Sequence, residues 1–331
     1  MKKTLVALAA VAVTGGAFAQ ATMTGAVAYG WNQATSSTGT SASGVGVNSN
    51  QLNFAISEDM ENGTKLSAAI GFNLGGESGS GTTGRDVTLT LNTASMGKFT
   101  FANTYGGNYL ANGIAAVGSD YEQDNSGGAG AAGALGTRSV NDSISWSMPL
   151  STELTIGITY QEPATDAGVG AGASGTAANT SDYQRSNTYS LTYKSGPLAA
   201  NFGYRTFDMA NAATGNSSTL NRGQAAYDMG VAKIGAGWSQ TTATYGNTST
   251  DTLVGLSIPL GQLTLSTQLA NRTTAGNAKS SADVSYSGKV ITAVYSLSKR
   301  TDVLATYKTW DAAYGATSTP SNLTAVMYHY F

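Results

Sequence analysis

The chain has 331 residues, no cysteine, a formal net charge of −2 and only 11% charged side chains. The lack of cysteine excludes disulfides and thiolate metal sites, and the mildly acidic balance gives no electrostatic footprint for nucleic acid. Soluble domains carry about 25% charged residues. The low charge content, together with 42 glycines, therefore points away from an ordinary soluble globule.

The N-terminal residues have the pattern of a secretory signal peptide. Lys2 and Lys3 precede an apolar stretch over residues 5–13, and a triplet with small residues at both ends, 17–19, follows it. This apolar stretch is shorter than the roughly 20 residues that a membrane helix needs. We expect residues 1–19 to be a cleaved signal peptide and residues 20–331 to form one domain.

Apolar and polar residues alternate with a period of two through the rest of the chain. In residues 65–74, Leu66, Ile70 and Phe72 share one parity, whereas Ser67 has the other. Such alternation over roughly ten residues suits a strand with one face in lipid and one in water. We count about sixteen strands, including a first one near 21–32 and two at the C-terminus. Residues 284–297 are apolar on both parities and leave their facing open.

Connections between these segments alternate in length. Tight turns are expected at 58–63, 93–97, 149–153, 195–197, 228–231 and 259–261. Long connections rich in Gly, Ser, Thr and Asn are expected at 33–49, 75–84, 106–137, 163–182, 209–221, 241–250, 273–281 and 312–321. A soluble β-sandwich gives no reason for this regularity. The pattern predicts an all-β, antiparallel transmembrane barrel with short periplasmic turns and long extracellular loops.

Several stretches resemble the sixteen-stranded general porins of Gram-negative β-proteobacteria: 57–66, 138–149, 226–233 and, most closely, the Y-x-L-S-K-R-T block at 295–302. The C-terminal Tyr328-His329-Tyr330-Phe331 is similar to the H-x-F end of that family. The resemblance implies a homotrimer in the outer membrane, in contact with its lipid and lipopolysaccharide. It also implies that the barrel assembly machinery recognises the last strand, through Met327, His329 and Phe331.

No arrangement of residues indicates catalysis. His329 is the single histidine, so a Ser-His-acid hydrolase has no base within the chain. No cluster has metal-ligand spacing, and the glycine run at 127–133 lacks the context of a phosphate-binding loop. We therefore expect neither an enzyme nor a cofactor or metal site.

The third long connection, 106–137, holds the acids of interest. The resemblance implies that this loop folds into the pore, and its only charged residues are Asp120, Glu122 and Asp124. These acids are our candidates for the pore constriction, with a solvated surface loop as the alternative. Parity nominates the pore-wall residues Lys65, Asp86, Lys98, Lys194 and Arg205.

The sequence thus predicts a water-filled channel for passive diffusion of ions and small hydrophilic solutes. Gln51 and Ala55 stand where the resemblance leads one to expect bases in the second strand, and Asp86 where it often has arginine. We therefore expect weak cation preference or near neutrality. A solute-specific channel and a surface adhesin or structural barrel remain alternatives.

Overall fold

The structure is a computed structural model that describes residues 20–74, 83–106, 109–110, 113–118, 139–163, 185–208, 217–243, 248–275, 284–311 and 318–331. Within these ranges the chain forms sixteen strands and a 3₁₀ turn, η1 (Glu61–Gly63). No helix in the described part of the chain is long and apolar enough to cross a membrane.

The strands follow one another around the molecule in chain order. They are β1 (Gln20–Thr35), β2 (Ser41–Asp59), β3 (Lys65–Asn73), β4 (Thr83–Thr93), β5 (Gly97–Gly106), β6 (Ser139–Pro149), β7 (Leu154–Pro163), β8 (Arg185–Ser195), β9 (Leu198–Asp208), β10 (Ser217–Asp228), β11 (Lys233–Ala243), β12 (Thr248–Leu260), β13 (Leu263–Thr274), β14 (Val284–Ser298), β15 (Thr301–Trp310) and β16 (Ser321–Tyr330).

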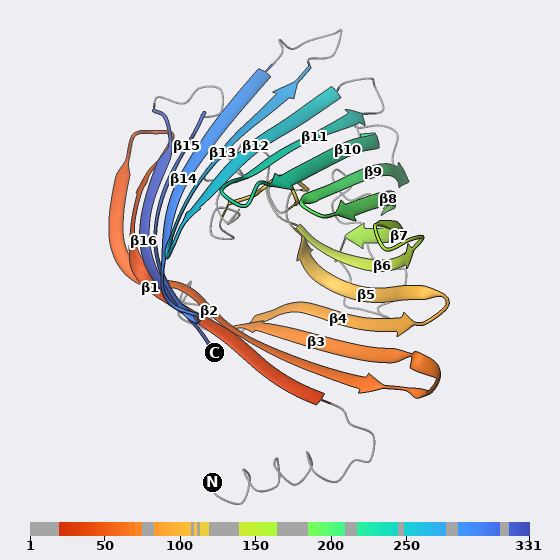
Figure 1. The fold of residues 1–331 in the computed structure, drawn as a ribbon. Helices are drawn as coiled ribbons and strands as arrows, with labels where there is room; N and C mark the ends of the chain where they lie inside the picture. The colour runs from red at the N-terminus through yellow and green to blue at the C-terminus, as the bar shows by residue number, and fades with distance from the viewer. Residues whose placement is uncertain are drawn as a thin grey trace, which may run out of the picture.

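Each strand pairs antiparallel with its neighbours, and β1 also pairs with β16, so the sheet closes into a barrel (Figure 1). The closing register runs from Ala26 opposite Tyr330 to Thr35 opposite Ser321. Closure leaves no sheet edge with unpaired backbone groups, which lipid cannot hydrogen-bond. The predicted sixteen-stranded antiparallel barrel is confirmed.

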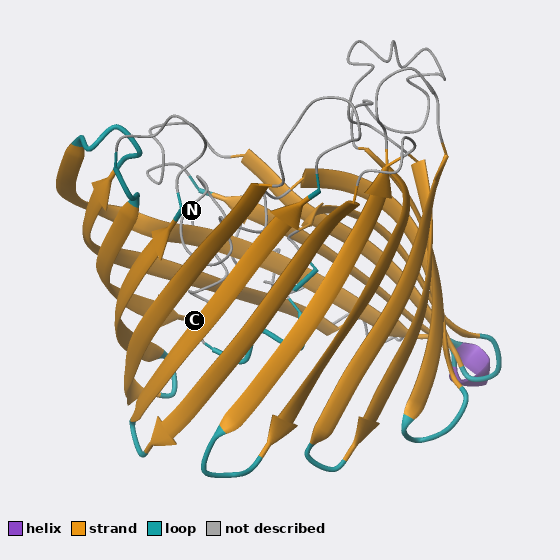
Figure 2. Cartoon of the chain, turned by 90° about the horizontal axis from the view of Figure 1, so that it is seen from above, coloured by secondary structure: helices purple, strands orange, loops and turns teal. Residues whose placement is uncertain are grey.

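Short turns gather at one end of the tilted strands (Figure 2). They fall at the predicted turn positions, and Gly97 and Gly196 take positive φ values of 81° and 52° there, which a residue without a side chain adopts without strain.

The prediction of a long first loop at 33–49 was wrong, because β1 and β2 stay paired up to Thr35 and Ser41. Residues 41–49 are mostly Ser, Gly and Asn, and a register shift opposite Ala28 and Tyr29 moves the outward positions to the other parity, so the alternation is lost although the hydrogen-bonded ladder continues.

Side chains alternate between the inside and the outside of the barrel as expected. On β12, Leu253 is 1% exposed and points inward, whereas Val254 is 48% exposed on the outer face. The sequence did not determine which residues of β14 face the lumen. In the structure Val290 and Thr292 point inward, and Ile291 points outward. Large apolar side chains thus cover the outer surface, as a lipid-facing barrel requires.

The interior holds two apolar clusters. One joins the inward faces of β1, β15 and β16 through Ala28, Leu304 and Val326. The other joins β12, β13 and β14 to the segment that follows β5, through Leu110, Ala115, Leu253, Ala270 and Val290. The second cluster shows that the connection after β5 begins inside the barrel.

Candidate functional site

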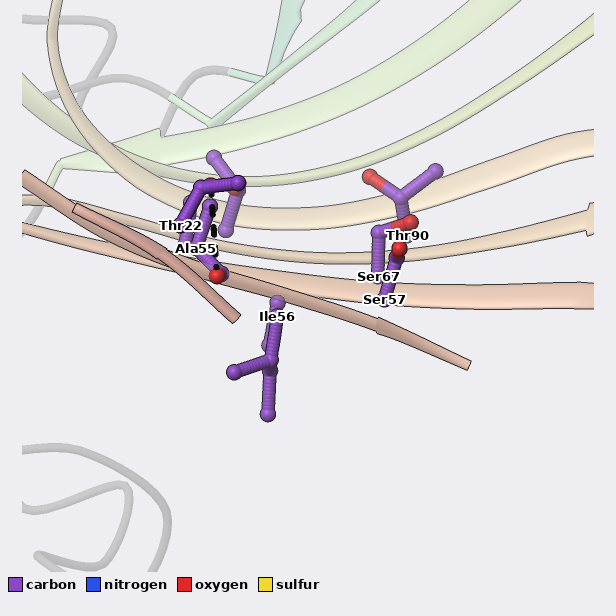
Figure 3. A pocket seen from close by; sticks show the side chains of 9 residues that line it. Thr22, Ala55, Ile56, Ser57, Ser67 and Thr90 are labelled. Atoms are coloured by element: carbon purple, nitrogen blue, oxygen red, sulfur yellow. Dashed lines mark hydrogen bonds between the residues drawn. The ribbon is translucent and has the colours of Figure 1, made fainter. Parts of the chain in front are cut away.

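Small polar side chains line the inner wall of β2, β3 and β4. Ser57, Ser67 and Thr90 lie on one face, and Ile56 points to the other (Figure 3). Thr22 donates a hydrogen bond of 3.4 Å to the carbonyl oxygen of Ala55 in the same region. This hollow on the wall therefore presents hydroxyl and methyl groups without charge, which suits contact with water and small hydrophilic solutes.

The connection between β5 and β6 starts against the inner wall of β9–β14. Leu110 and Ala115 are fully buried there, and Val117 is 5% exposed. Their neighbours on the wall are the inward-facing side chains of Leu253, Ala270 and Val290 and the glycines of β11 and β12. We call residues 109–118, as far as they are described, the docked segment. Apolar burial of this extent stabilises its position inside the barrel.

Polar contacts fix both ends of the docked segment. The Tyr109 hydroxyl donates a 2.6 Å hydrogen bond to Oδ1 of Asn201 on β9. The Ala115 backbone N–H donates a 3.0 Å hydrogen bond to Oε1 of Gln224 on β10. Burial raises the pKa of the Tyr109 hydroxyl, although the positive charge of Arg222 acts in the opposite direction. Tyr109 therefore stays protonated near neutral pH and keeps its donor role.

Three glycines make room for the docked segment on the wall. A side chain at Gly235 would come within 2.6 Å of Val117 Cγ1, and one at Gly237 within 2.6 Å of Leu110 Cδ2. At Gly255 the nearest atom would be the Ala115 carbonyl oxygen, at 2.9 Å. These distances are shorter than van der Waals contact. The absence of side chains on this part of β11 and β12 is thus a requirement of the docking.

The predicted wall residues occupy different heights in the barrel. Lys65, Lys98 and Lys194 are exposed and lie beside the short turns, so they surround the periplasmic mouth. Asp86 and Arg205 lie on the inward face nearer the opposite end, and both are partly buried. The five residues thus lie at different heights and do not form one site, and their role along the channel stays a prediction.

The sequence analysis missed several inward-facing charges. Arg222 lies on β10 against the Tyr109 ring, with its guanidinium carbon 4.1 Å from the ring centroid. Asp251 and Arg272 face each other on β12 and β13 and form a bidentate ion pair, with Nε–Oδ1 and Nη2–Oδ2 distances of 2.6 and 2.8 Å. Lys308 is 7% exposed on the inner face of β15. Arg272 has the parity opposite to that of the outward-facing Leu263 and Leu265, so the alternation of β13 would have found it, whereas Arg222 adjoins a segment predicted as loop.

The predicted constriction acids Asp120, Glu122 and Asp124 lie outside the described residues. The described part of their loop ends at Gly118, shortly before Asp120. A role in the constriction therefore stays a prediction. Among the described residues, no group of three or more His, Asp or Glu side chains is arranged to hold a metal ion.

The last strand presents the expected outward stripe. Met327 and Phe331 are 53% and 46% exposed on the outer face, and His329 shares that face. Phe331 continues the ladder past β16, since its backbone N–H donates to Gly25 and its carbonyl accepts from Gly25, at 3.1 and 3.0 Å. The role of these residues as an assembly signal remains a prediction.

Known proteins show the same architecture. An anion-selective porin from Comamonas acidovorans superposes with a TM-score of 0.67 at 18% identity, over 95% of this chain and 100% of that one. The outer-membrane channel DcaP of Acinetobacter baumannii gives a TM-score of 0.67 at 13% identity, over 95% and 97% of the two chains. OmpT of Vibrio cholerae, solved in a trimer form, gives 0.65 at 12%, over 95% and 99%.

No individually curated protein matches the sequence. A family model described as Gram-negative porin matches residues 4–312, which is most of the chain and includes the docked segment. Together with the closed sixteen-stranded barrel, this match decides the classification. The chain belongs to the Gram-negative porin family and forms a diffusion channel in the outer membrane.

Proposed function

We propose that the protein is a general diffusion channel for ions and small hydrophilic solutes, with weak charge selectivity and no catalytic step. The observation that carries this proposal is the polar inner wall of a closed barrel, partly filled by the docked segment. A pore of this kind sorts solutes by width and by the charges along its wall.

Charges of both signs line the barrel, and this favours near neutrality over cation preference. Arg222 and Lys308 add positive charge that the sequence analysis did not count. Asp251 neutralises Arg272 through their ion pair. The loop acids Asp120, Glu122 and Asp124 carry the negative charge that this proposal sets against the bases. Near neutrality follows if these acids enter the channel.

We also propose that three copies assemble with the first and last strands, β1 and β16, near the subunit contact. Large apolar side chains are exposed on their outer faces, including Met23, Tyr29 and Met327 at 58%, 55% and 53%. A trimer form of the structurally similar Vibrio cholerae protein supports this. Lipopolysaccharide and the barrel assembly machinery complete the proposed partners, with residues 1–19 as the cleaved export signal.

Conductance of the refolded chain 20–331 in planar bilayers tests the channel and its constriction. We would compare the wild type with the triple change Asp120→Asn, Glu122→Gln and Asp124→Asn, and read reversal potentials in a salt gradient. Closure in three steps is expected for the trimer, and a shift toward anion selectivity is expected for the triple variant.

Other outcomes discriminate between the proposals. An unchanged reversal potential would move the loop acids out of the channel and leave the diffusion function intact. A folded barrel without conductance would instead favour the adhesin or structural role. If one neutral solute among several tested reduces the ion current in a saturable way, a solute-specific channel would be favoured.

A further inference from the structure

Two arginines from neighbouring strands come together on the inner wall beside the docked segment. Arg222 on β10 stands opposite Gly203 on β9, and Arg205 lies two residues further along β9 on the same inward face. Side chains at such diagonal positions of neighbouring strands lie about 7–8 Å apart, so the two positive charges repel each other. Both side chains are partly buried, so water screens this repulsion less than at an open surface.

Gly203 and Tyr109 hold the Arg222 side chain flat against the wall. A side chain at Gly203 would come within 2.8 Å of Arg222 Nε, so the arginine lies in the space that the glycine leaves. The Tyr109 ring covers the guanidinium from the other side at 4.1 Å. The Arg222 side chain therefore crosses β9 at Gly203, two residues from Arg205. A guanidinium held between two surfaces has less conformational freedom to lose when it binds a ligand.

The arginine pair has neutral neighbours in the described part of the chain. Arg205 donates from Nε to the Thr188 hydroxyl at 2.8 Å. Arg222 Nε is buried and has no acceptor in the structure. No carboxylate among the described residues lies within 4 Å of either guanidinium, in contrast to Arg272 with its partner Asp251. Adjacent desolvated cations of this kind are stabilised by an anion that bridges them.

We propose that Arg205 and Arg222 form a binding site for a small oxyanion, a carboxylate or a phosphate, on the permeation path. The planar fork of a guanidinium matches two oxygens of such an anion, whereas a halide offers a single contact. This inference rests on the proposed diffusion function, because the anion reaches the site through the channel. Oxyanions would bind transiently at this site while they pass through a channel that is otherwise nearly neutral.

Single-channel recording with inorganic phosphate tests the site. Phosphate would replace chloride at constant ionic strength in planar bilayers holding the wild type, Arg222→Gln, Arg205→Gln or Arg222→Lys. A saturable reduction of wild-type current is expected, with the apparent affinity about tenfold weaker in either glutamine variant. Arg222→Lys keeps the charge but not the fork, so an intermediate affinity is expected. Acetate in place of phosphate separates a general carboxylate site from a phosphate site.

Lys289→Gln is the matched control, because this exposed lysine lies on the outer face of β14 and its change removes the same charge. Saturation should persist in that variant.

A wild-type current without saturation by phosphate or acetate overturns the proposal. If saturation appears only after the change of Asp120, Glu122 and Asp124, those acids are the partners of the arginines, which also overturns it. Channels that fail to conduct at all contradict the diffusion function instead. If a glutamine variant does not fold, the wild-type saturation curve and Arg222→Lys still decide.

Discussion

Replacing both Gly235 and Gly237 by alanine should loosen the docked segment from the wall of β11. The two added methyl groups would meet Val117 and Leu110, each at 2.6 Å, where ordinary contacts need about a further ångström. The backbone carbonyl of Ala115 also faces Gly235, so moving a side-chain rotamer alone does not relieve the overlap. The docked segment itself must shift.

The magnitudes indicate a partial release. Overpacking costs about 1–3 kcal/mol for each added group, hence about 2–6 kcal/mol for the pair. Against it stand the burial of Leu110 and Val117, the Gln224 hydrogen bond and the contact of Arg222 with Tyr109, which together contribute roughly 4–9 kcal/mol. A single alanine should therefore leave the segment docked. The pair brings the docked and released states close in free energy.

Open-channel noise and the closing voltage in planar bilayers report this release. We expect the double variant to show larger current fluctuations and to close at a lower voltage than the wild type, because the released segment moves in the channel. Gly223→Ala on the outer face of β10 is the matched control, since its nearest atom, Cδ2 of Phe202, is 3.8 Å away. A double variant with wild-type noise and closing voltage would refute the proposed position of the docked segment on β11.

Two further changes test other contacts. Ala115→Cys with Gly237→Cys should form a disulfide in this cysteine-free chain once the docked segment shifts slightly away from β11, because their Cβ positions are 3.0 Å apart, closer than the roughly 3.8 Å of a disulfide. A mobility shift on a non-reducing gel would show the bond, and its absence under oxidation would place the segment elsewhere. Asp251→Asn should destabilise the barrel by about 1–3 kcal/mol, because it removes the negative charge that pairs with the guanidinium of Arg272. Adding Arg272→Gln should restore most of the urea stability, and equal losses would contradict this account.

The sequence was sufficient for the architecture because each strand of a transmembrane barrel carries its own signal. Outward residues must be apolar and inward residues polar, so alternation gave the facing of β3 and β16, and short turns gave the orientation. The first connection was predicted poorly for the same reason. Residues 41–49 are mostly Ser, Gly and Asn, and the register shift opposite Ala28 and Tyr29 breaks their alternation, so a continuous ladder of hydrogen bonds leaves no trace in hydrophobicity.

The inner wall was only partly predictable. Parity assigns Lys65 and Arg205 to the inside, yet it treats every inward position alike. It therefore could not separate a lysine at the mouth from an arginine beside the docked segment. Leu253 and Val290 face inward and are apolar, so hydrophobicity alone does not separate them from the lipid-facing residues.

The sequence by itself determined that this chain closes into a barrel in the outer membrane, since periodicity and turn spacing are local properties. The tertiary structure decided which residues meet across the interior. Tyr109 and Arg222 are far apart in the chain, and only closure of the barrel brings a loop from β5 against β10 and β11. Contacts between segments so distant depend on the shape of the whole barrel, and no pattern within either segment encodes them.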